Sequence, residues 1–301
     1  MNKSYHKPVL IAEVLKFLEP KPHGIYIDAT FGGGGHTRAI LEAEPTCSVI
    51  AFDWDRKALE LHSEAFKEEF GKRITFLWGN FAHLYRLLKK ELKITQVDGI
   101  LADFGTSQAQ IFQKEGFSFA VDTPLDMRMS PAHQKVTAAH ILNFASEEEL
   151  VKIFFEYGEE RFSRKIARVI LEERKNYFIN TTKQLADIVE RVSPRRSHIH
   201  PATRIFQALR IAVNHELENI QAFLQQSLQL LANDGRLVCI SFHSLEDRIV
   251  KQFLVSHQCK TGCDGFEILT KKIITATDEE LKENPSSRSA RLRAARRCCI
   301  D

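Results

Sequence analysis

The 301-residue chain has only six cysteines, and two of them, Cys298 and Cys299, are adjacent. So few thiols are a poor basis for a disulfide framework and are typical of a reducing cytosol. The chain has no run of about 18 apolar residues, so we expect no membrane-spanning helix. Its first residues lack the apolar segment of a secretory leader, so we expect a cytoplasmic protein.

Extremes of composition are also absent. Hydrophobic residues make up 44% of the chain and charged residues 27%, as in ordinary globular domains. The net charge of +3 is too small to identify a partner, so the positions of the charges matter more than their sum. The length suits one large domain, or one domain that carries a smaller companion.

The first hundred residues alternate between two patterns. Short apolar segments typical of buried strands alternate with stretches of helical spacing, such as Arg56 to Phe70. Strands and helices that alternate at this spacing indicate a parallel sheet built from βαβ units. The four expected strands are IYIDAT, SVIAFDWD, ITFLWGN and VDGILADFG.

This rhythm stops near residue 111. From 111 to 204 the spacing is helical, with a capping box expected at Ser146–Glu149 and a helix cap at Thr181–Gln184. Strands return in RLVCISF and FEILTKKII, after a long helix that we expect to begin at Pro201. The sequence therefore predicts a doubly wound α/β domain, residues 1–110 and 205–301, interrupted by an all-helical domain, residues 111–204.

Four consecutive glycines, Gly32 to Gly35, follow the first expected strand. Glycine loses the most backbone freedom on folding, so such a run suggests a place where no side chain is allowed. The run does not fit the dinucleotide fingerprint G-x-G-x-x-G/A, because Thr37 or Arg38 occupies its last position. A tight turn between a strand and a helix is the simpler alternative.

Polar side chains follow the expected strands where each one ends. Asp28 ends the first strand, Asp53 and Asp55 the second, Asn80–Phe81 follow the third, and Asp103 ends the fourth. The carboxyl ends of parallel strands meet at one edge, where an acid such as Asp53 can hold a ribose. The pattern favours a nucleoside without a pyrophosphate, such as S-adenosylmethionine, with Phe81 beside the adenine. Solvated loop carboxylates are the alternative.

Several longer motifs carry a resemblance. Through YIDATFGGGGHT, GFSFAVDTPLDMRM, HPATRIFQALRIAVNHEL, GRLVCISFHSLEDRIVK and SSRSARLR, the chain resembles the bacterial MraW/RsmH methyltransferases over nearly its whole length. The resemblance implies a Rossmann-like class I methyltransferase fold, with a helical substrate-recognition domain inserted after the fourth strand. It also implies methyl transfer from S-adenosylmethionine to N4 of a cytidine in the decoding centre of 16S rRNA. The cofactor contacts it implies are Gly34, Gly35, His36, Asp53, Phe81, Asp103 and Gln110.

Two segments depart from the pattern of that family. Residues 103–110 read DFGTSQAQ where the family has DLGVSSPQ, and Thr123 replaces the glycine of the family's DGPLDMR. If that turn required a positive φ angle, a threonine there would be strained.

The exocyclic amine of cytosine is a poor nucleophile, because its lone pair is delocalised into the ring. Catalysis must therefore unstack the base, align the nitrogen and offer acceptors for its N–H groups. We expect Asp103 to be an acceptor, and Asp126 and Arg128 to lie near the target nucleotide. The alternatives are that Asp103 contacts only the cofactor and that Asp126 and Arg128 form a structural ion pair.

The stretch SFHSLED follows the fifth expected strand. His243 and Glu246–Asp247 either line the target pocket or belong to a helix start capped by Ser244.

A protein that binds RNA needs a basic surface. Near the C-terminal end of the chain, five arginines fall within ten residues, with no acid until Asp301. In the alternative, Leu292 and Ile300 dock this segment on the sheet and its arginines pair with carboxylates. The predicted RNA-binding residues are Arg195, Arg196, Arg288, Arg291, Arg293 and Arg296.

Cys259, Cys263, Cys298 and Cys299 match structural zinc sites poorly in their spacing, so we expect no metal. Two other functions stay open: a nicotinamide-dependent oxidoreductase, which the failed fingerprint disfavours, and a non-catalytic ribosome-assembly factor with a vestigial nucleoside site. The expected partner is 16S rRNA within the small ribosomal subunit, and a homodimer is left open.

Overall fold

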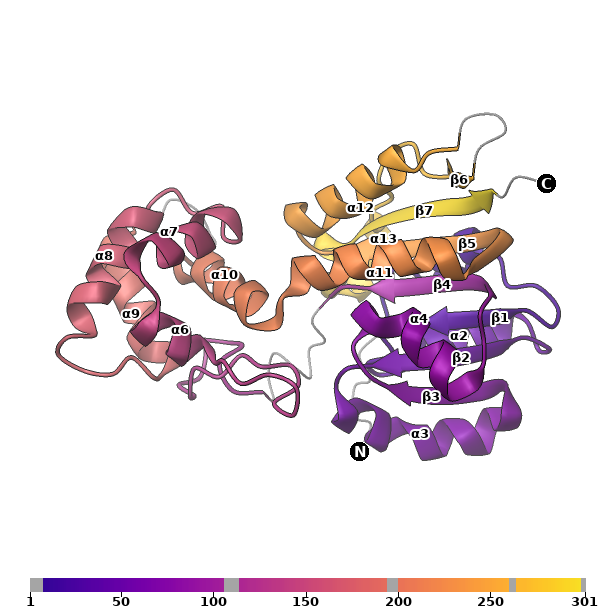
Figure 1. The fold of residues 1–301 in the computed structure, drawn as a ribbon, viewed down its shortest axis with the longest axis horizontal. Coiled ribbons are helices and arrows are strands. Elements are labelled where there is room, and N and C mark those ends of the chain that lie inside the picture. The colour runs from indigo at the N-terminus through magenta and orange to yellow at the C-terminus, as the bar shows by residue number, and fades with distance from the viewer. Residues whose placement is uncertain (1–7, 106–113, 194–199, 260–263, 299–301) are drawn as a thin grey trace. The chain divides into compact units, whose positions relative to one another are not determined.

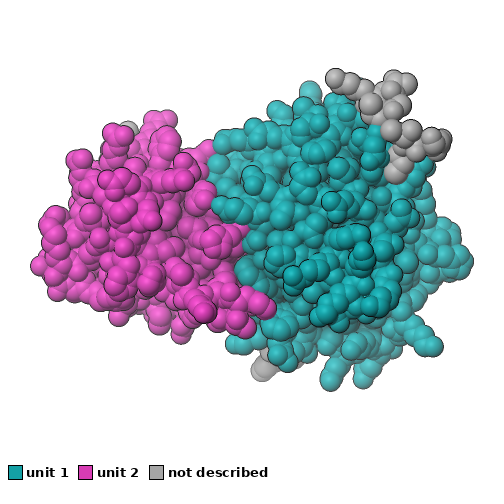
Figure 2. Space-filling view, viewed as in Figure 1, with its two compact units in different colours: residues 1–105, 217–301 teal, residues 106–216 magenta. Residues whose placement is uncertain are grey.

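The computed structural model describes residues 8–105, 114–193, 200–259 and 264–298. The chain divides into two compact units (Figure 2). We call residues 1–105 together with 217–301 the sheet unit, and residues 106–216 the helical unit. Within the described ranges, every helix is too short or too polar to traverse a lipid bilayer.

The described part of the sheet unit contains a seven-stranded sheet with the order β3-β2-β1-β4-β5-β7-β6 (Figure 1). Strands β1 to β5 are parallel, and β7 is antiparallel to both of its neighbours. The strand order reverses between β1 and β4, which is where ligands bind in open α/β sheets. The strands are β1 Ile25–Asp28, β2 Ser48–Asp53, β3 Ile74–Trp78, β4 Val97–Asp103, β5 Leu231–Ser241, β6 Gly265–Ile268 and β7 Arg291–Cys298.

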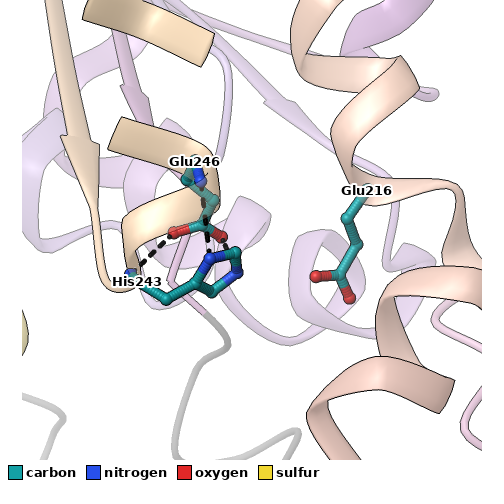
Figure 3. A group of neighbouring side chains, drawn as sticks. All are labelled: Glu216, His243 and Glu246. Carbon is teal, nitrogen blue, oxygen red and sulfur yellow. Dashed lines mark hydrogen bonds and ion pairs between the residues drawn. The ribbon is translucent and has the colours of Figure 1, made fainter. Parts of the chain in front are cut away.

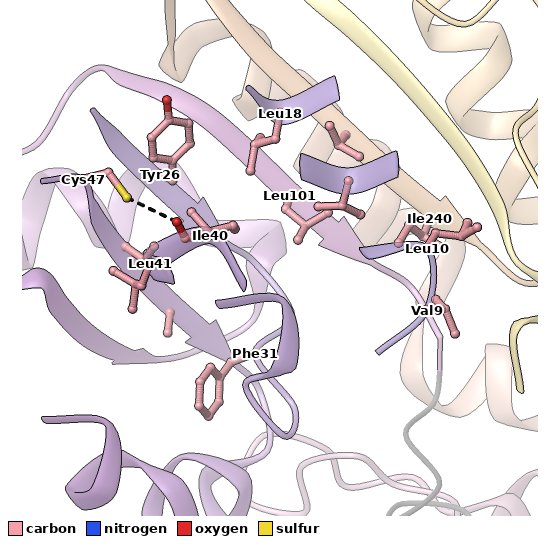
Figure 4. Close-up of a cluster of buried hydrophobic side chains, with 14 of the residues drawn as sticks. Val9, Leu10, Leu18, Tyr26, Phe31, Ile40, Leu41, Cys47, Leu101 and Ile240 are labelled. Atoms are coloured by element: carbon pink, nitrogen blue, oxygen red, sulfur yellow. Dashed lines mark hydrogen bonds between the residues drawn. The ribbon is translucent and has the colours of Figure 1, made fainter. Parts of the chain in front are cut away.

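Side chains on each strand alternate between two apolar clusters, one on each face of the sheet. On β1, Tyr26 belongs to one cluster and Ile27 to the other, and on β4 Leu101 and Ile100 divide in the same way. Figure 4 shows the first cluster. Because both faces are buried, the strands are nearly continuous apolar runs, and the predicted Rossmann-like α/β fold is confirmed. The helices of this unit are α1 Ile11–Leu18, α2 Gly35–Ala43, α3 Arg56–Phe70, α4 Leu84–Leu87, α11 Glu216–Leu230, α12 Ser244–Ser256 and α13 Asp278–Glu283.

The helical unit has its own core, formed by residues such as Phe154, Ile166 and Leu185. Its helix starts follow local rules: Ser146 forms a capping box with Glu149, and Thr181 forms one with Gln184. Both predicted caps are confirmed. The described helices are α6 Ala138–Phe144, α7 Glu147–Glu156, α8 Ser163–Glu173, α9 Thr182–Val192 and α10 Ala202–Asn214.

The long helix expected after Pro201 is two helices. His215 adopts a left-handed conformation with φ 51°, which ends α10 before α11 begins. At this end of α10, the side chain of Asn214 donates to the carbonyl of Met127 at 2.9 Å and accepts from the amide of Met129 at 2.8 Å. These bonds tie α10 to the segment PLDMRM, so the helical unit extends to Glu216 instead of ending at residue 204.

Thr123 carries no backbone strain of the kind considered above, because it is not among the residues with positive φ. Its amide donates to Oγ1 of Thr182 at 3.0 Å, and its own Oγ1 accepts from Gly116 at 3.1 Å. The positive φ in this segment belongs to Met127, at 63°.

Candidate active site at the carboxyl edge of the sheet

The glycine turn between β1 and α2 excludes side chains partly because of the protein's own aromatic residues. Gly32 and Gly34 have positive φ angles of 53° and 77°. A Cβ on Gly34 would lie 2.5 Å from the ring of Phe66 and 2.7 Å from that of Phe31. The two rings pack edge to face, 5.3 Å apart, in the buried core. Gly34 is therefore required by the fold, whatever the turn binds.

The rest of the turn has two different environments. A Cβ on Gly35 would lie 2.6 Å from Pro8, and the buried His36 has its Nε2 2.8 Å from the carbonyl oxygen of Val9. His36 thus ties the start of α2 to the segment that precedes α1. Gly33, in contrast, is exposed, and no atom lies within 4 Å of its Cβ position. The turn therefore opens at Gly33 and is closed at the two glycines that follow.

Asp53, at the end of β2, is 8% exposed. Its Oδ2 accepts from the amide of Gly32 and its Oδ1 from that of Asp55, both at 2.7 Å. Burial raises the pKa of Asp53 from 3.8 to about 6, against the effect of these hydrogen bonds. The carboxylate therefore ties the glycine turn to β2, and each oxygen keeps a lone pair for a ligand.

Asp28 and Asp103 are the other two acids at this edge. Asp28 accepts from Oγ1 of Thr37 at 2.7 Å, and burial raises its pKa. Asp103 accepts from the amide of Gly105 at 2.9 Å through Oδ1, and no described residue donates to its Oδ2. Burial raises the pKa of Asp103 to about 6, and the nearby charge of His36 opposes the shift.

The register of the sheet brings these three acids together. Asp28 on β1 lies opposite Ala51 on β2 and Leu101 on β4, so Asp53 and Asp103 each follow two residues farther along. No described lysine or arginine forms an ion pair with any of the three carboxylates. A group of largely buried acids without a lysine or arginine partner suits a positively charged ligand that also carries hydroxyl groups.

Aromatic residues border this edge. The ring of Phe81 packs 5.5 Å from Phe223 and 6.0 Å from Phe104, centroid to centroid. Two tryptophans that were not among the predicted site residues also lie here. Trp54 directly follows β2, and Trp78 ends β3 and donates from Nε1 to the Trp54 carbonyl at 3.1 Å. Their positions directly beside the expected strand ends were the available signal.

The start of α12 is a capping box near the acidic edge. Nδ1 of His243 accepts from the amide of Glu246 at 3.4 Å, and the carboxylate of Glu246 accepts from the amide of His243 at 3.2 Å (Figure 3). His243 is thus the cap in place of the expected Ser244. The negative charge of Glu246 contributes to the raised pKa of Asp103, so this helix start lies close to the site.

Asp126 and Arg128 lie in the helical unit as an ion pair. Nε and Nη2 of Arg128 donate to the two carboxylate oxygens of Asp126, each at 2.7 Å, and Nη1 donates to the carbonyl of Gln134 at 3.1 Å. Burial acts to raise the pKa of Asp126, but the hydrogen bonds with Arg128 outweigh it and lower the pKa. This is the geometry of the structural alternative, and a role near the target nucleotide stays a prediction.

Most of the C-terminal arginine cluster lies on β7, inside the sheet. Leu292 is fully buried, Arg293 makes a two-bond pair with Asp247 at 2.6 and 3.1 Å, and Nε of Arg296 donates to Glu267 at 2.7 Å. Two of the predicted RNA-binding residues therefore already pair with carboxylates, as in the docked alternative.

The remaining predicted RNA contacts divide into two groups. Arg288 is exposed and Arg291 partly exposed, and neither side chain makes a hydrogen bond or ion pair with a described residue. Arg195, Arg196 and the predicted cofactor contact Gln110 lie outside the described residues.

Replacing Arg293 with alanine is expected to lower the free energy of unfolding by about 2–4 kcal/mol, because Asp247 would be left mostly buried without its partner. Arg291→Ala, on the same strand, is the matched control and should change stability by less than about 0.5 kcal/mol. Urea unfolding of both variants measures the difference. Equal stabilities would show that the Arg293–Asp247 pair does not support the fold.

The sheet order, the glycine turn and the acidic edge together define a Rossmann-like methyltransferase domain with a nucleoside site. The chain belongs to the MraW methylase family, whose sequence model matches residues 3–298. Its members use S-adenosylmethionine as the methyl donor.

Relatives cover almost the entire chain. A protein of Cyanothece sp. named ribosomal RNA small subunit methyltransferase H is 50% identical, over 97% of this chain and 94% of its own length. A protein of the same name from Sulfurihydrogenibium sp. is 48% identical, over 97% and 99%. Among solved structures, an rRNA methylase from Streptococcus thermophilus aligns over 99% of both chains at 10% identity, and its TM-score of 0.46 is too low to add to this conclusion.

The residues present fit S-adenosylmethionine. Its ribose hydroxyls match an acceptor such as Asp53, and its positive sulfonium and ammonium groups match an edge where three acids have no described lysine or arginine as an ion-pair partner. Gly33 leaves space for a ligand to approach the backbone of the turn.

Proposed function

We propose that this protein transfers a methyl group from S-adenosylmethionine to the exocyclic N4 of a cytidine in the decoding centre of small-subunit rRNA. The observation that carries the proposal is Asp103: a partly buried carboxylate, at the switch point of a methyltransferase sheet, with one oxygen that no described residue occupies. The relatives named as small-subunit rRNA methyltransferases support the class of substrate.

In this proposal the residues of the turn hold the cofactor. Asp53 accepts from the ribose hydroxyls, while Gly33 lets the ligand approach the backbone. Gly34, Gly35 and His36 fix the shape of the turn through their packing against Phe66 and Pro8 and the contact of His36 with the Val9 carbonyl. Phe81 and Gln110 remain proposed contacts of the cofactor.

When bound, the cofactor supplies an electrophilic methyl group on a positively charged sulfur. Asp103 accepts a hydrogen bond from the target amine. This bond favours a more pyramidal nitrogen, whose lone pair is less delocalised into the ring and therefore more nucleophilic. As the N4–methyl bond forms, the sulfur–methyl bond would break and its electron pair would stay on sulfur as a neutral thioether. The nitrogen loses a proton, and with a pKa of about 6 the ionised Asp103 is an acceptor for it near neutral pH. Asp126 and Arg128, whose ion pair fixes the segment PLDMRM, are assigned in this proposal to the target nucleotide.

RNA contacts are assigned to the arginines not used inside the fold. Arg288 and Arg291 have no described partner, and Arg195 and Arg196 complete the proposed set. Contacts of this kind to phosphates position the RNA without reading its sequence.

The test is mass spectrometry of small-subunit rRNA nucleosides from cells with and without this gene. N4-methylated cytidine should disappear without the gene, and purified protein should restore it on isolated subunits when S-adenosylmethionine is present. An assembly factor without catalysis would bind subunits and restore nothing. An unchanged nucleoside profile in the deletion strain would contradict the proposal.

Cofactor affinity is expected to fall about tenfold between pH 7 and pH 5, because Asp53 must be ionised to hold the ribose and its pKa is about 6. Stability moves the other way. A carboxyl whose pKa is higher in the folded than in the unfolded state destabilises the folded protein as it ionises, so the free energy of unfolding should fall as pH rises from about 4 to 6. Calorimetric titration and thermal unfolding across this range measure both trends.

Asp53→Asn is the control for this pH dependence. It keeps the shape of the side chain but cannot ionise, so its cofactor affinity should be weaker at pH 7 and depend less on pH. A wild-type affinity that stays constant from pH 5 to 7 would contradict the assignment.

A further inference from the structure

Helix α8 has one buried face and one face that carries only positive charge in its first two turns. Ser163, Ile166, Ala167 and Ile170 are buried in the helical unit. On the opposite side, Arg164, Lys165 and Arg168 are exposed, as is Arg161 just before the helix. We call Arg161, Arg164, Lys165 and Arg168 the basic face of α8.

The neighbouring helices do not share this feature. The exposed side of α7 combines Lys152 with Glu148 and Glu156, and that of α9 combines Lys183 with Asp187. Mixed charges of this kind are typical of a solvated helix surface. The single sign of the basic face is therefore not a general property of this unit.

The position of these cations does not serve the helix. The first turn of α8 contains no acidic residue, and Arg164 and Lys165 lie in it, where the helix dipole disfavours positive charge. Nor do they serve the packing, because the side chains of Arg161, Arg164 and Lys165 form no hydrogen bond or ion pair with the described residues. Arg168 alone has a carboxylate partner, the exposed Glu147, at 3.0 Å. A local cost without an internal benefit points to an external anion.

We propose that the basic face of α8 binds the phosphate backbone of the substrate RNA. The proposal rests on the proposed function and extends it to a second surface, distinct from the arginines near the chain's C-terminal end. Within the helix Arg164, Lys165 and Arg168 span about 6 Å, and Arg161 extends the row beyond the first turn, which suits a chain of phosphates better than a single small anion. Contacts of this type release counterions and carry no sequence information.

The test compares two triple variants that each remove three positive charges from the helical unit. One is Arg161→Ala, Arg164→Ala and Lys165→Ala; the matched control is Lys152→Ala, Lys175→Ala and Lys183→Ala. The probes are small ribosomal subunits from cells that lack this gene and the rRNA extracted from them. Binding is measured between 50 and 200 mM salt, a range over which phosphate contacts weaken strongly.

The basic-face variant should bind both probes about 10- to 100-fold more weakly, and its salt slope should fall by about two to three units on a log–log plot. Its cofactor affinity should equal that of the wild type. Its melting temperature should equal or slightly exceed that of the wild type, because the removed cations opposed the helix dipole. The control variant should keep the wild-type slope.

Three outcomes would overturn the proposal. An unchanged affinity and salt slope in the basic-face variant would show that these residues make no phosphate contacts. An equal loss of affinity in the control variant would show that overall charge, and not this face, determines binding. A loss on subunits but not on extracted rRNA assigns the face to a ribosomal protein. Failure of the proposed function is recognised separately, because the wild-type protein would then not methylate the subunits at all.

Discussion

Replacing Asp103 with alanine is expected to lower the rate of methyl transfer by about 100- to 1,000-fold, the typical effect of removing one preorganised acceptor or donor in a buried site. Cofactor affinity should fall by less than about tenfold, because Asp53 and the turn remain. The variant should fold, and at neutral pH it should be at least as stable as the wild type. The reason is that burial raises the pKa of Asp103 to about 6, so its ionised form opposes folding above that pH.

Single-turnover methylation of isolated small subunits at saturating cofactor measures this effect, and calorimetry on the same preparation measures cofactor affinity. Asp103→Asn is the conservative control, because its carbonyl oxygen still accepts a hydrogen bond but cannot take up the proton. It should recover part of the loss. Equal losses of rate and affinity would instead assign Asp103 to the cofactor alone.

Substitutions at two adjacent glycines are expected to fail for different reasons. Gly34→Ala should lower the free energy of unfolding by about 2–4 kcal/mol, because φ is 77° and the new Cβ would overlap the rings of Phe66 and Phe31. Gly34→Val should not fold stably. Gly33→Val should keep the wild-type stability, since no atom lies within 4 Å of its Cβ position, but weaken cofactor binding by at least about tenfold.

Urea unfolding and cofactor calorimetry on Gly33→Val and Gly34→Ala separate the two roles. The double variant Gly34→Ala with Phe66→Ala should lose less stability than the sum of the two single changes, because the smaller side chain relieves the overlap. If Gly33→Val binds the cofactor as the wild type does, the open space over the turn is not where the ligand lies.

These predictions differ from what the glycine run suggests by itself. Four glycines in sequence indicate a crowded backbone, but they do not identify the neighbour that crowds it. At Gly34 that neighbour is Phe66, which is remote in sequence, and at Gly35 it is Pro8. The contact that excludes a side chain is therefore a property of the packed core.

The convergence of the acids was predictable, because it follows from local patterns and one geometric rule. Strand and helix periodicities located β1, β2 and β4, and the carboxyl ends of parallel strands must meet at one edge. Asp28, Asp53 and Asp103 each end one of these strands, so they share that edge. Their raised pKa values were not predictable, because burial depends on what covers the edge.

The helix boundary near His215 shows where local reasoning stops. The apolar spacing continues from α10 into α11 without a glycine or proline between them, so the sequence indicated one helix. The bonds of Asn214 to Met127 and Met129 accompany the break. Such contacts join residues more than eighty positions apart, and no pattern within a single window reports them.

The sequence by itself determined the alternating α/β architecture, the helical insertion, the acidic strand ends and the family, because each depends on periodicity, spacing or a contiguous motif. Only the tertiary structure decided which charges are free to act. Arg293 and Arg296 were predicted to bind RNA, yet they pair with Asp247 and Glu267. The sequence did not distinguish Arg161, Arg164 and Lys165, whose side chains have no described partner. The physical reason is that an ion pair forms between residues brought together by packing, so the availability of a charge is decided by the folded chain as a whole.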